Sequence, residues 1–183
     1  GGDLGRLAIA DLHAGAQRFE RSASWLRSIA EAVDYAHRLG LLHLDLKPGN
    51  ILIDEAGEPH VADFGLARPL DSSLSVDADE VSGTPNYMAP EQALLRSHKL
   101  SAATDIYGLG AILYELVTGR PPFRGATPME TLRQVLSRSP AAPSELRPDL
   151  PKDLEAICLK CLEKTPQQRY RSARELADDL GRY

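Results

Sequence analysis

The sequence lacks the features that mark disulfide-bonded, secreted and membrane-spanning proteins. It contains no apolar run of about 18 residues, and its first residues show no basic stretch followed by an apolar one. We therefore expect a cytosolic protein, or a cytosol-facing domain of a larger one, without a membrane segment. The only cysteines, Cys158 and Cys161, lie in one helix-like stretch with no second ligand pair nearby. We expect them to be buried, reduced core residues rather than a zinc or redox site.

Aromatic residues and positive charge are also scarce. Only 5% of the residues are aromatic, so the core must be built mostly from Leu, Ala, Ile and Val. Asp and Glu number 26 against 21 Lys and Arg, and the net charge of -5 argues against general binding to nucleic acids or anionic membranes. With 43% hydrophobic and 26% charged residues, the 183-residue chain is otherwise an ordinary globular sequence of one domain's length.

One stretch, residues 43–65, carries most of the information and reads HLDLKPGNILIDEAGEPHVADFG. Two short apolar runs, at 51–53 and 60–62, are separated by the turn-rich sequence DEAGEP. This pattern predicts a β-hairpin, which brings its two ends back to the same place. Side chains just before and just after the hairpin should therefore lie close together.

The residues at the two ends of this hairpin suggest phosphate chemistry. Asp45 and Asn50 precede it and Asp63 follows it, so three oxygen-bearing side chains should converge. Such oxygens suit a hard divalent cation, and Lys47 adds a positive charge that could neutralise a phosphoryl group. Taken singly, each is an ordinary loop residue, because turns are rich in Asp, Asn, Gly and Pro. The complete pattern is far more restrictive than any one of its members.

H-x-D-x-K-x-x-N followed by D-F-G closely resembles the catalytic and metal-binding loops of the protein kinase family. Two later motifs agree in order and spacing. GTPNYMAPE at 83–91 resembles the loop that forms the family's substrate platform, and CLEKTPQQRY at 161–170 resembles a segment near the end of its large lobe. The combination looks most like the bacterial eukaryotic-type Ser/Thr kinases.

The resemblance covers the chain from residue 1 to 183 and one lobe only. It implies a mainly α fold, the large C-terminal lobe of the protein kinase domain, with short β-hairpins around the catalytic loop (43–50) and the start of the activation segment (63–91). The sequence contains no glycine-rich phosphate loop, no strand lysine and no helix glutamate to pair with it, so the small lobe is absent. Whether the chain is a fragment or a complete product is left open. The helices are expected at 22–39, 102–118, 128–138, 151–164 and 172–182.

The resemblance assigns a role to each residue of the catalytic loop. Asp45 matches the catalytic base that orients the substrate hydroxyl, and Lys47 matches the residue that meets the γ-phosphate of ATP. Asn50 and Asp63 match the two protein ligands of Mg²⁺. Thr84 matches a residue whose hydroxyl bonds Asp45 and Lys47, and this arrangement favours Ser/Thr over Tyr as substrate. His43 and Phe64 are expected to pack rather than to react.

Two more residues match nucleotide contacts, each with an alternative. Leu52 matches the residue beneath the adenine, although it could equally be plain strand core. Asp3 matches an acidic hinge residue that hydrogen-bonds the ribose, although it could equally cap a helix that starts directly after it. ATP and Mg²⁺ are thus the implied cofactors, and a protein with a Ser or Thr is the implied substrate.

Three further expectations concern the support of the site. Asp105, near the start of a buried helix, should bond backbone N–H groups of the catalytic loop. Glu91 and Arg169 should form a buried ion pair. Leu44 replaces the family's usual Arg, so we expect activity that does not depend on phosphorylation of the activation segment.

The leading hypothesis is a Ser/Thr protein kinase domain whose lobe alone, as given, is inactive. The alternative is a pseudokinase or scaffold that binds protein partners without chemistry. Retention of Asp45, Lys47, Asn50 and Asp63 together favours catalysis.

Overall fold

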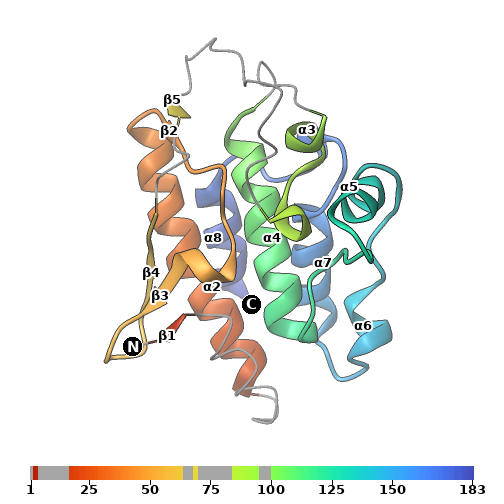
Figure 1. Ribbon diagram of the computed structural model, residues 1–183. Helices are drawn as coiled ribbons and strands as arrows, with labels where there is room; N and C mark the ends of the chain where they lie inside the picture. Colours follow the sequence, from red (N-terminus) through yellow and green to blue (C-terminus); the bar gives the residue numbers. More distant parts are fainter. Residues whose placement is uncertain (1, 4–16, 64–67, 70–83, 95–99) are drawn as a thin grey trace.

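The computed structural model of the chain describes residues 2–3, 17–63, 68–69, 84–94 and 100–183, and the fold within them is mainly helical (Figure 1). The α-helices are α2 (Gln17–Arg38), α3 (Pro90–Ala93), α4 (Ala102–Thr118), α5 (Pro128–Ser137), α6 (Pro143–Leu146), α7 (Lys152–Cys161) and α8 (Ala173–Arg182). Short 3₁₀ turns are η1 (Pro48–Asn50), η2 (Pro85–Tyr87) and η4 (Pro166–Gln168). The strands are β1 (Gly2–Asp3), β2 (Leu41–Leu42), β3 (Ile51–Ile53), β4 (Pro59–Val61) and β5 (Arg68–Pro69).

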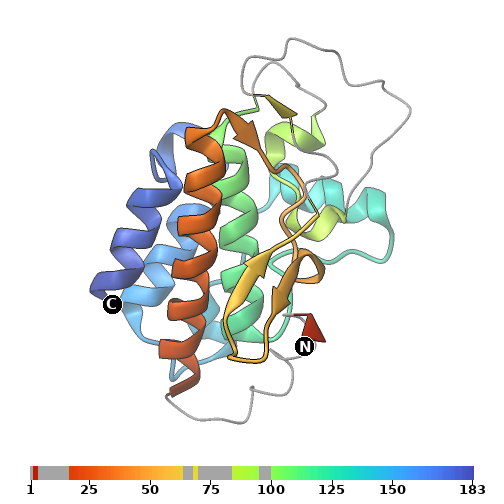
Figure 2. The same cartoon turned by 90° about the vertical axis from the view of Figure 1, so that its left-hand side faces the viewer.

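Helix α4 forms the centre of the domain. Its sequence is apolar on nearly all sides, and it contacts α2 and α8 as well as α6 and α7 (Figure 2). Its observed bounds, 102–118, are the predicted ones. The helix ends where Gly119 adopts a left-handed conformation with φ of 83°, a geometry that favours glycine. A rigid central helix gives the loops at its ends a fixed reference.

Helix α2 packs along α4 and leads the chain toward the predicted catalytic loop, residues 43–50. The face predicted from three-and-four spacing is buried in the core and consists of Leu26, Ile29, Ala30, Val33 and Ala36. The helix ends at Arg38, one residue before the predicted end, and Gly40 follows it with φ of 77°. The helix begins at Gln17, before the predicted start. This first turn was missed because QRFERS carries one apolar residue and shows no helical period.

The predicted hairpin is present as β3 and β4, one residue from the predicted position on its second strand. Ile51 pairs with Val61 and Ile53 with Pro59 in antiparallel register. The indole N–H of Trp25 donates to the Gly57 carbonyl at 2.9 Å, which fixes the hairpin turn to α2. Strand β1, which pairs with β3, was not predicted. Two residues are too few to show a period of 2.

The remaining long helices lie close to the predicted ranges, with α5, α7 and α8 each shortened at one or both ends. Helices α3 and α6 were not predicted, because four residues make only one turn. Most of the predicted activation segment, residues 64–67 and 70–83, lies outside the described residues, and so does the helix expected after Asp3. In the described parts of the chain, none of the helices combines the length and apolar character needed to cross a lipid bilayer.

The contact between α4 and α7 is unusually close. A Cβ built on Gly110 would lie 2.4 Å from the Cβ of Cys161, so only glycine fits here. Cys158 contacts the same turn of α4, with its sulfur 3.7 Å from the Gly110 carbonyl oxygen. Both cysteines are reduced and fully buried, and burial raises the pKa of each thiol. The predicted structural role of the pair is therefore confirmed.

Gly110→Ala is expected to destabilise the domain. Overpacking a core costs roughly 1–3 kcal/mol, which exceeds the gain of up to about 1 kcal/mol from replacing helical Gly with Ala. The melting temperature should fall by several degrees in a thermal scan. The control is Gly181→Ala in α8, where the nearest atoms belong to the long Arg27 side chain at 3.4 Å. Equal stability of the two variants would contradict the close packing.

Candidate active site

The catalytic-loop residues converge around the carboxylate of Asp45. The ammonium group of Lys47 lies 2.6 Å from Oδ2 of Asp45. The amide Nδ2 of Asn50 donates to the same Oδ2 at 3.0 Å and to the backbone oxygen of Asp45 at 2.8 Å. The tight turn η1, which begins with Pro48, folds Asn50 back over Asp45. Three of the predicted site residues therefore form one hydrogen-bonded cluster.

The loop backbone is held by Asp105 at the start of α4, as predicted. Its carboxylate accepts the N–H of His43 at 2.9 Å and the N–H of Leu44 at 2.8 Å. His37 of α2 supplies a third partner, with its Nε2 2.7 Å from Oδ2 of Asp105. Leu44 has φ of 65°, a left-handed conformation that costs a non-glycine residue energy and needs such support.

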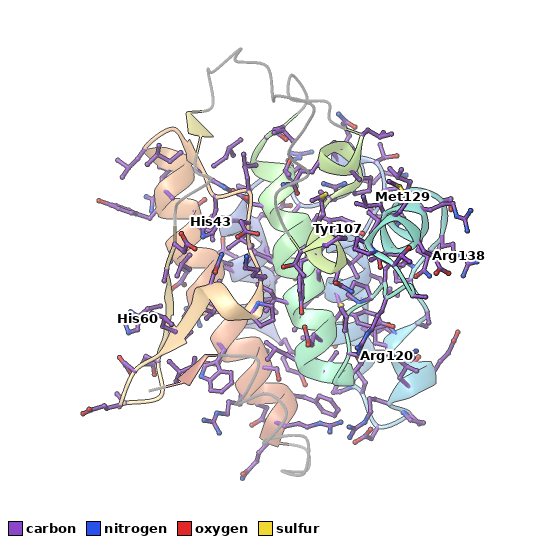
Figure 3. The ribbon with its side chains drawn as sticks, in the orientation of Figure 1. His43, His60, Tyr107, Arg120, Met129 and Arg138 are labelled. Atoms are coloured by element: carbon purple, nitrogen blue, oxygen red, sulfur yellow. The ribbon has the colours of Figure 1, made fainter. Side chains whose placement is uncertain are left out.

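His43 links the catalytic loop to the hairpin. The side chain, which is labelled in Figure 3, is buried. The N–H of Asp45 donates to its Nδ1 at 3.3 Å, and its Nε2 lies 3.2 Å from the Ala62 carbonyl oxygen. Because Nδ1 accepts, Nε2 carries the proton and donates to Ala62. His43 thus joins Asp45 to the residue just before Asp63, which agrees with the predicted packing role. Its expected partner Phe64 lies outside the described residues.

The hairpin brings Asp63 back to the catalytic loop. The N–H of Ala62 donates to the Asn50 carbonyl at 2.8 Å. Asp63, the next residue, therefore follows directly on the point where the hairpin meets the end of the catalytic loop. Asp63 is exposed and has φ of 61°, which Asp tolerates better than most residues. The predicted convergence of the two hairpin ends is present.

The oxygen atoms at this point fit a magnesium ion. Asn50 uses its Nδ2 to bond Asp45, so its amide oxygen is the atom that it would offer to a cation. Asp63 adds an exposed carboxylate. Within the described residues, no three His, Cys, Asp or Glu side chains lie close enough to form a metal site by themselves. An ion held by one carboxylate, one amide and substrate phosphates is the usual arrangement for Mg²⁺.

The end of the predicted activation segment is anchored by the Glu91–Arg169 ion pair. Nη1 of Arg169 lies 2.7 Å from Oε1 of Glu91, and Nη2 lies 2.9 Å from Oε2. Further donors of Arg169 reach the backbone oxygens of Ala103, Glu163 and Lys164. Both side chains are buried, at 0% and 5% exposure. The predicted buried, bidentate pair across 78 positions is confirmed.

Comparison with known proteins identifies this arrangement. The family model of the protein kinase domain matches residues 7–179. The chain belongs to the protein kinase family. A probable serine/threonine-protein kinase PknB of Bifidobacterium longum is 42% identical over 157 residues, which are 85% of this chain and 22% of that protein. The serine/threonine-protein kinase PknB of Mycobacterium tuberculosis is 39% identical over 165 residues, 89% of this chain and 26% of that protein. The chain thus spans about a quarter of these relatives.

With the kinase family established, the fold is that of a mainly helical large lobe, as predicted. Leu52 and Asp3, the two residues matched to nucleotide contacts, are cross-strand neighbours in β3 and β1. Leu52 is 50% exposed, whereas Ile51 and Ile53 on either side are buried. The alternative that Leu52 is plain strand core is therefore wrong. The match of Leu52 to the residue beneath the adenine stays a prediction.

Thr84 lies beside the kinase catalytic loop but does not make the expected contact. It lines one hollow together with Asp45, Leu44 and Gln92. Among the described contacts its hydroxyl bonds neither Asp45 nor Lys47, whose side chains bond each other instead. The predicted Thr84 hydrogen bonds are thus not present in this structure.

Two further anchors of the platform loop were not expected from the sequence. The Tyr87 hydroxyl donates to Glu115 of α4, and Asn86 donates to the Phe123 carbonyl at 2.8 Å. Burial raises the pKa of Glu115 and, together with the Glu115 hydrogen bond, that of Tyr87. A charged residue inside the apolar α4 pattern was the available signal for Glu115.

Proposed function

We propose that this chain is the large lobe of a Ser/Thr protein kinase that transfers the γ-phosphate of ATP to protein hydroxyl groups. The observation that carries the proposal is the cluster of Lys47 and Asn50 on the Asp45 carboxylate, at 2.6–3.0 Å. In this assignment residues 1–183 are one catalytic lobe, with 43–50 as the catalytic loop and 63–91 as the activation segment. The relatives are named serine/threonine-protein kinases, which supports the same substrate class.

In the proposed reaction Asp45 accepts the proton of the substrate hydroxyl. The hydroxyl oxygen forms a bond to the γ-phosphorus while the bond to ADP breaks, and Asp45 keeps the attacking oxygen in line. Lys47, already beside Asp45, neutralises charge on the transferred phosphoryl group. Asn50 and Asp63 would hold Mg²⁺, which when bound neutralises charge on the β- and γ-phosphates.

Nucleotide binding in this lobe would use the surface around β3. Leu52 would lie under the adenine, and Asp3 would accept a hydrogen bond from a ribose hydroxyl. The strand register supports this, because Asp3 and Leu52 are direct Cα partners in β1 and β3. The proposed partners are ATP and a protein substrate with Ser or Thr. The absence of nucleic-acid binding and the cytosolic location remain predictions.

The competing proposal is a pseudokinase lobe that binds proteins without chemistry. It gives no reason for Asp45, Lys47 and Asn50 to remain hydrogen-bonded to one another. Catalysis needs these groups in fixed positions, whereas a binding surface does not. The geometry therefore favours an active enzyme.

Residues 1–183 alone are expected to fold but to show no kinase turnover. Positioning of ATP depends on groups that hold its α- and β-phosphates, and the sequence has no glycine-rich loop for them. The experiment compares the chain with a protein in which a glycine-rich nucleotide-binding lobe precedes it, called here the two-lobed protein. Calorimetry and γ-phosphate transfer with Mg²⁺ and ATP should show tight binding and turnover only in the latter. Turnover by residues 1–183 alone would disprove the expectation, and a folded, inactive two-lobed protein would favour the pseudokinase.

Phosphatase treatment of the two-lobed protein should leave its transfer rate unchanged. An arginine at position 44 would receive a phosphate from the activation segment, whereas Leu44 provides no charge. The acidic residues of the segment do not replace a phosphate here, because they too would need a positively charged side chain at position 44. The measurement is the initial rate before and after treatment, with removal of phosphate verified by mass spectrometry. A fall by orders of magnitude would contradict this expectation.

A further inference from the structure

Gln92 is the one side chain of α3 that bonds the catalytic loop in the described part of the chain. Its Nε2 donates to the backbone oxygen of Leu44 at 2.8 Å, and its Oε1 accepts the N–H of Ala89 at 3.0 Å. One carboxamide thus joins the end of the activation segment to the peptide bond that precedes Asp45. Residues 44 and 92 lie 48 positions apart, so the contact is a tertiary one.

The peptide that Gln92 holds is the strained one. Leu44 has φ of 65°, and a non-glycine residue keeps such a conformation only when its surroundings fix it from several sides. Asp105 of α4 bonds the N–H of Leu44 at 2.8 Å, and Gln92 of α3 bonds its carbonyl. The two polar backbone groups of Leu44 are therefore held by two different helices. Loss of the Gln92 donor would free the carbonyl end, which is the end that carries Asp45.

The residue at position 44 makes this contact more important. Leu44 cannot attract a phosphate, so a charge-based link between activation segment and catalytic loop is absent at this position. The Gln92 amide forms a neutral link between the same two segments. It also lines the hollow that contains Asp45 and Thr84, close to where a substrate hydroxyl would enter.

We propose that Gln92 is a positioning residue that aligns Asp45 with the end of the activation segment independently of phosphorylation. It acts through the Leu44 carbonyl and does not touch the reacting atoms. The proposal deepens the proposed kinase function, and its rate measurement rests on that function. Amide hydrogen exchange in the catalytic loop gives a second measurement that does not.

Gln92→Glu separates the two bonds of this side chain. A carboxylate still accepts the Ala89 N–H but has no proton to donate to the Leu44 carbonyl. In the two-lobed protein, kcat should fall roughly 10- to 100-fold, because small misplacements of a catalytic group have effects of this size. KM for ATP and the melting temperature should stay close to those of the parent. Exchange of the amides in residues 43–46 should become faster. The matched control is Gln167→Glu, an exposed position in η4 that should change none of these values.

Each outcome decides the proposal. A lower kcat with unchanged KM for ATP and faster exchange supports it. Unchanged exchange overturns it whatever the rate, and so does faster exchange with unchanged kcat. If the parent two-lobed protein transfers no phosphate, the proposed kinase function fails, and exchange alone then decides whether Gln92 positions the loop. If Gln92→Glu does not fold, Gln92→Met is measured by the same criteria, since Met keeps the aliphatic packing and removes both bonds.

Discussion

Asp63→Ala in the two-lobed protein is expected to lower the rate of phosphate transfer about 1,000-fold or more, because a bound metal supplies several kcal/mol of transition-state stabilisation and each 1.4 kcal/mol is tenfold in rate. The fold should survive, since Asp63 is exposed and lies at the end of the hairpin. The measurement is the initial rate as a function of Mg²⁺ concentration.

Two further variants make the Asp63 result specific. Asp63→Asn removes the charge but keeps a residue that tolerates the left-handed backbone at φ of 61°, so it separates the metal from the conformation. Asp178→Ala removes an exposed carboxylate on α8, far from Asp63 in the sequence, and this variant should leave the rate of phosphate transfer unchanged. An Asp63→Ala protein with normal activity would refute the metal assignment.

Arg169→Met is expected to destabilise the domain by about 3–5 kcal/mol, because it leaves the Glu91 carboxylate buried without its partner. The backbone oxygens of Ala103, Glu163 and Lys164 would lose donors as well. For a domain of this size the melting temperature should fall by roughly 10 °C. Unfolding in urea or by heat, followed by circular dichroism, gives the value.

A surface ion pair provides the matched control for Arg169. Arg174 and Asp178 on α8 are 2.8 Å apart but 60% and 47% exposed. Exposed pairs contribute only up to about 1 kcal/mol, so Arg174→Met should have a small effect. The double variant Glu91→Met with Arg169→Met should recover part of the lost stability, because no buried charge then remains uncompensated. Equal losses for Arg169→Met and Arg174→Met would show that burial of the pair contributes nothing.

The residues predicted best from sequence are those fixed by local patterns. Residues 43–63 contain the signals for a loop, a hairpin and a turn in order. Helix α4 is predicted by the apolar run between Ser101 and Gly119. The Glu91–Arg169 pair was predictable at long range only because both residues lie in family motifs. Without the motifs, nothing in the spacing of the two residues indicates a contact.

The contacts that sequence analysis missed are polar ones between distant segments. His37 to Asp105 and Gln92 to Leu44 each join separate elements, and a single polar side chain on a helix has no period that reveals its partner. At Thr84 the motif indicated the neighbourhood of Asp45, but the direction of the hydroxyl depends on the local backbone, which the motif does not specify. Strand β1 was missed because its pairing with β3 involves two residues only.

The central claim is that Asp45 serves phosphate transfer to Ser or Thr, and one measurement tests it directly. The two-lobed protein is incubated with Mg²⁺, γ-labelled ATP and a mixed protein substrate, and the labelled amino acids are identified. The account predicts phosphoserine and phosphothreonine, with the label lost in Asp45→Asn while ATP binding is retained. Undiminished label in Asp45→Asn, or label on tyrosine alone, would contradict it.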